Sequence, residues 1–66
     1  MELKRTKGGY RITVDFASKE GTSNYAVFFW DGSKLKVKEI TDLDYLESLS
    51  EEVSQYLNKI KKLGVL

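Results

Sequence analysis

Residues 24–30 read Asn-Tyr-Ala-Val-Phe-Phe-Trp, and this aromatic run decides how the chain folds. The run is apolar at both odd and even positions, which is typical of a central strand covered on two sides. Residues 10–16 before it alternate strictly between apolar and polar side chains, as in a strand with one buried face. Residues 34–40 after it alternate again, with Leu35 and Val37 on one side and lysines on the other. The sequence therefore predicts three strands.

The connections between these strands are short. Residues 18–23 are polar and contain one glycine, which suits a hairpin loop. Asp31-Gly32 is a strong hairpin signal between two apolar runs. Three strands joined in this way form an antiparallel meander with residues 24–30 in the middle.

From Thr41 onward the apolar period changes from two to between three and four. The apolar positions are Leu46, Leu49, Val53, Tyr56, Ile60 and Leu63, widened by Leu43, Tyr45 and Leu57. This spacing predicts an amphipathic helix that Thr41 can cap and that Gly64 can end. The pattern leaves open whether one helix covers 42–63 or a short turn precedes a helix from about residue 50.

The predicted fold class is α+β: a three-stranded antiparallel meander with one C-terminal amphipathic helix packed on one face (β-β-β-α). A chain of 66 residues allows one domain with a thin core. We expect that domain to span 10–66. We expect residues 1–9, which carry Lys4, Arg5 and Lys7 before a diglycine, to form a flexible basic arm.

The helix can cover only one face of such a sheet, so the other face shows one side of the aromatic strand. If Asp31-Gly32 is a two-residue turn, then Tyr25 and Phe29 point away from the helix. If the loop has three residues and a bulge at Gly32, then Phe28 and Trp30 do so instead. We favour the first arrangement. In both, arginine and lysine side chains surround exposed rings, and apolar patches of this kind often mark binding sites.

Composition excludes several classes of protein. The chain has no His and no Cys, so the usual proton shuttles and thiol nucleophiles are missing, and we predict neither an enzyme nor a metal or cofactor site. No apolar run approaches the length of a membrane helix, and we expect a cytoplasmic protein that binds no membrane. Abundant Lys and Glu without Cys lean towards a thermophile.

These observations predict a small nucleic-acid-binding or ribonucleoprotein-associated module that takes RNA or DNA. Its predicted contacts are Lys4, Arg5, Lys7, Arg11, Thr13, Tyr25, Phe29, Lys34, Lys36 and Lys38, with Phe28 and Trp30 replacing Tyr25 and Phe29 in the shifted arrangement. The alternative is a protein-interaction module, either a homodimer or a small regulator of a larger partner, that uses the same face. A third interpretation is that the lysine stems simply cover the rings.

Overall fold

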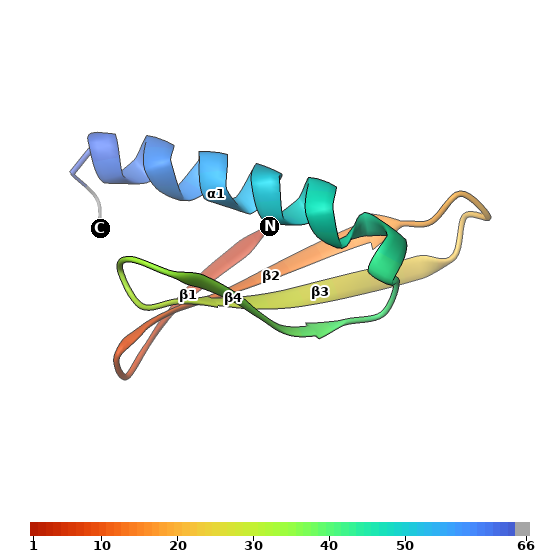
Figure 1. Cartoon of the computed structure of the whole chain (residues 1–66), viewed down its shortest axis with the longest axis horizontal. Helices are drawn as coiled ribbons and strands as arrows, with labels where there is room; N and C mark the ends of the chain where they lie inside the picture. Colours follow the sequence, from red (N-terminus) through yellow and green to blue (C-terminus); the bar gives the residue numbers. More distant parts are fainter. Residues whose placement is uncertain (65–66) are drawn as a thin grey trace.

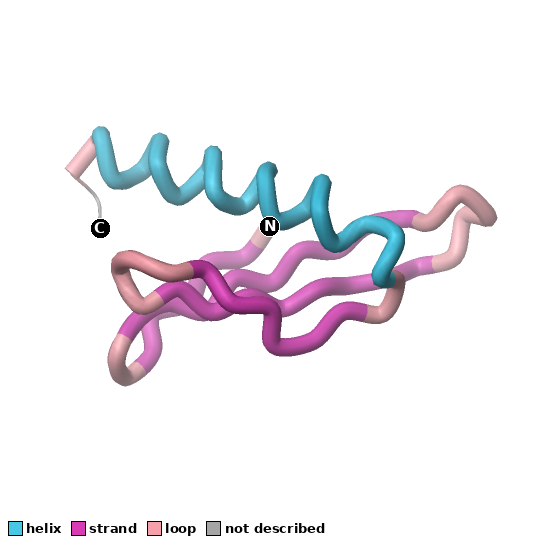
Figure 2. The backbone as a smooth tube through the Cα atoms, in the orientation of Figure 1, coloured by secondary structure: helices cyan, strands magenta, loops and turns pink. Residues whose placement is uncertain are grey.

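The computed structural model describes residues 1–64 and shows a sheet covered on one side by a helix (Figure 1). Its elements are β1 (Glu2–Thr6), β2 (Gly9–Ala17), β3 (Ser23–Trp30), β4 (Leu35–Ile40), the single-turn 3₁₀ helix η1 (Leu43–Tyr45) and α1 (Leu46–Lys62). The strands are antiparallel and lie in the order β1-β2-β3-β4. The tube view separates the two layers, strands below and helix above (Figure 2). The predicted α+β class and C-terminal helix are confirmed, and residues 65–66 of the predicted domain lie outside the described residues.

The prediction of three strands is wrong, because residues 2–6 of the expected arm form β1. The loop 7–8 joins β1 to β2, with Thr6 opposite Gly9 across the hairpin. Gly8 has a φ of +87°, a left-handed conformation that glycine adopts without steric cost, so the diglycine makes a turn rather than ending an arm. Leu3 pairs with Ile12 and packs against the core, which anchors β1.

The core lies between α1 and the facing side of the sheet. Its buried members are Ile12, Val14, Ala26 and Phe28 from the strands and Leu49, Val53 and Leu57 from α1. Phe28, only 1% exposed, is the largest of them. Full burial of a side chain of this size stabilises the fold by about 1.5–3 kcal/mol.

The turn between β3 and β4 is longer than both sequence alternatives. Trp30 pairs with Leu35, so the loop contains four residues, 31–34. The Asp31 carboxylate accepts hydrogen bonds from the backbone N–H groups of Ser33 and Lys34, both at 2.9 Å, which closes the loop. A loop two residues longer than the favoured one preserves the side-to-side alternation, so Ala26, Phe28 and Trp30 still face α1.

β4 contains a bulge, although its lysines occupy every second position of the sequence as they would in a regular strand. Phe28 pairs with Val37 but Val27 pairs with Glu39, so Lys38 is an extra residue without a partner on β3. The bulge reverses the alternation, because a regular strand would turn Ile40 outward and Glu39 toward α1. Ile40 instead packs against the core, while Val37, predicted on the buried side, is left 43% exposed.

The helical segment resolves into two parts. Asp42, rather than Thr41, caps η1 by accepting a hydrogen bond from the Asp44 N–H at 3.1 Å. α1 then begins at Leu46 without a side-chain cap. Gly64, with a φ of +74°, follows the last turn, and its N–H bonds to the Lys61 carbonyl at 3.1 Å, as the sequence predicts.

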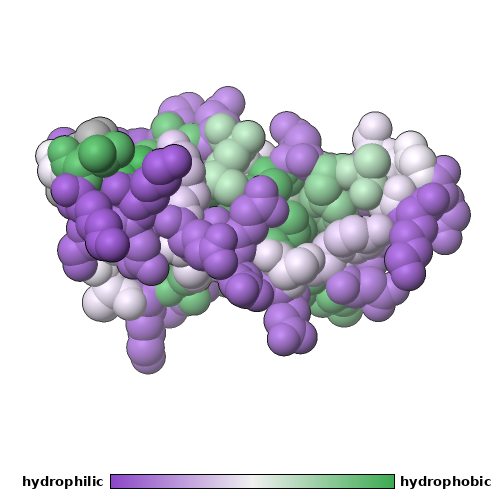
Figure 3. Space-filling model, turned by 90° about the horizontal axis from the view of Figure 1, so that it is seen from above, coloured by the Kyte–Doolittle hydropathy of each residue, from purple (hydrophilic) through white to green (hydrophobic). Residues whose placement is uncertain are grey.

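Two leucines of the predicted apolar stripe lie outside the core: Leu43 and Leu63 are both largely exposed. Seen from the helix side, the surface is mostly hydrophilic, with hydrophobic side chains among the polar ones and at the end where α1 finishes (Figure 3). The stripe is therefore buried only along its middle, where α1 lies against the sheet.

The adjacent glycines Gly8 and Gly9 are needed for different reasons, and substitutions should separate them. A Cβ on Gly9 would overlap the Trp30 carbonyl oxygen and lie 2.8 Å from Phe29 Cζ. We expect Gly9→Ala to lower the free energy of unfolding by about 1–3 kcal/mol through overpacking. Gly8→Asn should cost less than about 1 kcal/mol, because its surroundings are open and Asn tolerates positive φ. Urea denaturation tests this, and equal losses in both variants would contradict it.

The Asp31 turn should make stability depend on acid pH. Hydrogen bonds from the Lys34 and Ser33 backbone lower the pKa of Asp31 from 3.8 to about 2. The resulting stabilisation is complete above the unfolded pKa and disappears as pH falls through the folded pKa, so stability should drop between about pH 5 and pH 2. Asp31→Asn should remove that part of the drop in the urea midpoint, whereas Glu52→Gln, exposed on α1, should retain it. An unchanged profile in Asp31→Asn would refute the assignment.

Candidate functional site

The sheet face that points away from α1, here called the open face, presents its side chains in rows that run across the strands. The first row contains Lys4, Arg11, Phe29 and Lys36, and is called the basic row. The second row contains Glu2, Thr13, Val27 and Glu39. The third contains Asp15 and Tyr25. Positive and negative side chains are thus separated along the direction of the strands.

The aromatic strand is only partly bare on this face. Val27 is 5% exposed although no helix covers it, because Thr13 and Glu39 flank it across the strands and Tyr25 and Phe29 flank it along β3. Phe29 is half-buried, and Tyr25 is 37% exposed. The apolar centre of the open face is therefore covered by neighbouring side chains of the same face.

Phe29 lies at the centre of the basic row and has two close neighbours. The end of its ring, Cζ, lies over Gly9, where a side chain would collide with it. The Lys38 ammonium lies over the ring, with Nζ 5.7 Å from the ring centroid. Cation–π contacts at exposed sites are weak, about 0.5–1 kcal/mol. The ring is thus fixed at one end by the β1–β2 hairpin and covered on its face by a flexible side chain.

Tyr25 lies in a different electrostatic setting. Asp15 is directly opposite it on β2. A hydrogen bond to the Glu39 carboxylate, and the negative charge of that group, raise the pKa of Tyr25 above its usual value. Its backbone is held by Thr41, whose Oγ1 accepts from the Tyr25 N–H at 3.0 Å and whose N–H donates to the Tyr25 carbonyl at 3.1 Å. Phosphate groups near this tyrosine would meet carboxylates.

The structure brings together five of the predicted site residues and separates the others. Arg11, Lys36 and Lys38 lie around the Phe29 ring, and Lys4 continues the basic row beyond Arg11. Thr13 and Tyr25 lie on the same face in the second and third rows, and Lys7 and Lys34 lie in the two turns beside the basic row. Arg5 pairs with Tyr10 on the helix side of the sheet. Phe28 and Trp30 also face α1, so the shifted arrangement does not occur.

Sequence reasoning missed Gly9 and Glu39. Gly9 makes room for the ring of Phe29, and only the pairing of β2 with β3 reveals it. Glu39 reaches the open face through the bulge. A signal for the bulge does exist in the sequence: Val37 and Ile40 are both apolar but three positions apart, which a regular strand with one buried face does not allow.

Charge is also segregated over the whole molecule. The β1–β2 and β3–β4 turns lie at the same end as the C-terminus of α1, and the β2–β3 loop lies at the other (Figure 1). Lysines gather at the first end: Lys7 and Lys34 in the turns and Lys59, Lys61 and Lys62 in α1. The molecule is 38 Å long, so its positive end is well separated from the acidic start of α1.

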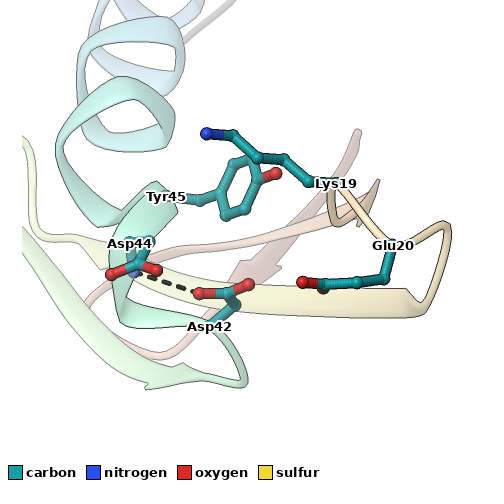
Figure 4. A pocket seen from close by; sticks show the side chains of 5 residues that line it. All are labelled: Lys19, Glu20, Asp42, Asp44 and Tyr45. Atoms are coloured by element: carbon teal, nitrogen blue, oxygen red, sulfur yellow. Dashed lines mark hydrogen bonds between the residues drawn. The ribbon is translucent and has the colours of Figure 1, made fainter.

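A shallow hollow of about 240 Å³ lies at the acidic end. It is lined by Lys19, Glu20, Asp42, Asp44 and Tyr45, and Figure 4 shows the Glu20 and Asp42 side chains pointing toward each other across it. The Asp42 carboxylate already caps η1, and among residues 1–64 no group of acidic side chains has an arrangement that could hold a metal ion. The hollow thus lies between the β2–β3 loop, which supplies Lys19 and Glu20, and the η1 segment, which supplies Asp42, Asp44 and Tyr45.

Searches against protein-family models, curated proteins and solved structures found no match for this chain. In the described part of the chain, no helix combines the length and apolar character needed to cross a bilayer.

The environment of Tyr25 can be checked by titration. We expect the pKa of Tyr25 to lie above 10.0, because ionising the phenol next to the Glu39 carboxylate is unfavourable. Glu39→Gln should move this pKa down, whereas Glu51→Gln, exposed on α1, should leave it unchanged. NMR of ¹³Cζ-labelled tyrosine measures it. A Tyr25 titration that Glu39→Gln does not alter would contradict the described contact.

Proposed function

We propose that this protein is a small, non-enzymatic module that binds nucleic acid, free or within a ribonucleoprotein, through the basic end of its open face. The observation that carries the proposal is the register of the sheet. It puts Arg11 and Lys36 on the two sides of the Phe29 ring. Lys4 extends the row, and Lys38 lies over the ring.

These residue types match the two needs of nucleic-acid binding. Arginine and lysine side chains neutralise phosphates and release condensed counterions, which supplies most of the affinity. An aromatic ring offers a flat apolar surface on which a base stacks regardless of its identity. The arrangement therefore favours contacts that depend little on sequence.

The acidic rows limit the size of the interface. Glu2 and Glu39 lie in the row next to the basic row, and Asp15 lies in the row beyond. They repel phosphates, so binding is confined to one end of the face. This fits a net charge of only +1, which is too small for a protein that coats nucleic acid indiscriminately.

The same segregation of charge supports a second candidate, self-association. Two open faces meeting with one copy turned end for end would place the basic row of each over the acidic rows of the other. Such face-to-face packing of sheets is common, and its interface would be isologous. In this case Phe29 would lie at the centre of a protein–protein interface.

Salt dependence tests the first candidate. The basic row and Lys38 supply four cations: Lys4, Arg11, Lys36 and Lys38. The logarithm of the association constant for a single-stranded oligonucleotide should therefore fall with log[salt] with a slope of about −3. Replacing Lys4 or Lys36 by Gln should make the slope less steep by about 0.7. Lys19→Gln, at the acidic end, is the matched control and should leave it unchanged. Fluorescence anisotropy between 50 and 300 mM salt gives the slopes.

Light scattering distinguishes the second candidate. A dimer that dissociates at high salt and in Lys36→Gln, together with no oligonucleotide binding, would replace the nucleic-acid proposal by self-association. A monomer that binds with the expected slope would support the nucleic-acid proposal and exclude the dimer.

A further inference from the structure

The rows of the open face also indicate which form of nucleic acid fits and in which direction it lies. We propose that the ligand is a single strand that crosses β2, β3 and β4 along the basic row and stacks one base on Phe29 in the place that the Lys38 ammonium now occupies. This inference rests on the proposed function. It adds that the nucleic acid is single-stranded, that it runs across the β-strands, and that a base displaces the Lys38 ammonium from the Phe29 ring.

The path follows from the charges. A nucleic-acid strand that ran along β3 from Phe29 to Tyr25 would carry its phosphates past Glu39 and Asp15. A strand that crosses the sheet meets Arg11 on one side of the ring and Lys36 on the other. Neighbouring strands lie about 4.8 Å apart, so the backbone positions of these two residues are roughly 10 Å apart with Phe29 between them. A nucleotide on the ring would thus have a cation beside each of its flanking phosphates.

The strandedness follows from the ring. Bases in a duplex are already stacked on each other and offer no free face to Phe29, whereas single-stranded bases can unstack onto an aromatic side chain. The basic row, with Phe29 at its centre, therefore gains base stacking when it binds a single-stranded nucleic acid and gains none when it binds a duplex. Tyr25, which we expected from the sequence to share the stacking, lies between carboxylates and has no part in this path.

Lys38 can make a contact in both the free and the nucleic-acid-bound protein, because it is the extra residue of the bulge. In the free protein its Nζ lies 5.7 Å from the centroid of the Phe29 ring, where the incoming base must stack. It has no partner on β3, and its long side chain can turn from the ring to a phosphate. Base stacking is stronger than an exposed cation–π contact, so the base displaces the ammonium.

The experiment compares a single-stranded oligothymidine of about eight nucleotides with an abasic oligomer of equal length and with a duplex of equal phosphate count. The wild-type protein should bind the oligothymidine about 5- to 150-fold more tightly than the abasic oligomer, the range expected for one stacked base. Phe29→Leu should abolish this ratio, whereas Tyr25→Leu should change it less than about twofold. The wild-type comparison needs no variant, so it remains decisive if Phe29→Leu does not fold.

Lys38→Gln gives an independent measurement. It should weaken binding of both single-stranded oligomers through the lost charge, but raise the ratio between them about 2- to 5-fold, because the ring is no longer covered by the ammonium. A lysine that only contacts phosphate would leave the ratio unchanged, and that result would overturn the displacement step.

The outcomes separate this inference from the proposed function. Salt-dependent binding with equal affinity for the oligothymidine and the abasic oligomer, or tighter binding of the duplex, would overturn the stacked single strand and leave the nucleic-acid interface standing. Absence of binding to all three probes would overturn both.

Discussion

The packing of α1 against one side of the sheet is the contact on which the rest of the structure depends. Ile12, Phe28 and Val53 are essentially inaccessible to water, and they join the two layers. One helix of 17 residues covers one face, and residues 1–64 contain no further layer. The apolar side chains of β3 that point away from α1 are therefore covered by neighbouring side chains of the open face.

The sequence predicted those parts of the fold that depend on local periodicity. Alternation and the helical stripe were enough to place β2, β3, β4 and α1. The side of β3 that faces the helix was favoured correctly but not decided, because it depended on the length of the Asp31 turn. β1 was missed because Leu3 is its only core residue, so its strand character comes from pairing with β2 rather than from its own pattern. The Asp31 turn was predicted in place but not in length, because its carboxylate selects the longer loop by binding the Ser33 and Lys34 amides.

The candidate site was predicted in its residue types and its face, but not in its division by charge. That division depends on which residues lie opposite one another, and register is set by contacts between strands. If β3 were shifted by two residues, Phe29 would take the place of Val27 and lie between Thr13 and Glu39. The separation of Phe29 from Tyr25 into a basic and an acidic environment is thus a property of the folded sheet, and no motif in the chain encodes it.

The two outer edges of the sheet are not equivalent. The bulge at Lys38 interrupts the free edge of β4, whereas the outer edge of β1 belongs to a strand that pairs without interruption. Edge-to-edge growth of sheets needs a regular row of free N–H and C=O groups on both sides of every copy. Two copies that joined through β1 would leave only interrupted edges at the outside. Assembly by this route would end at a pair, because the interrupted β4 edges offer no regular row of N–H and C=O groups to a third copy.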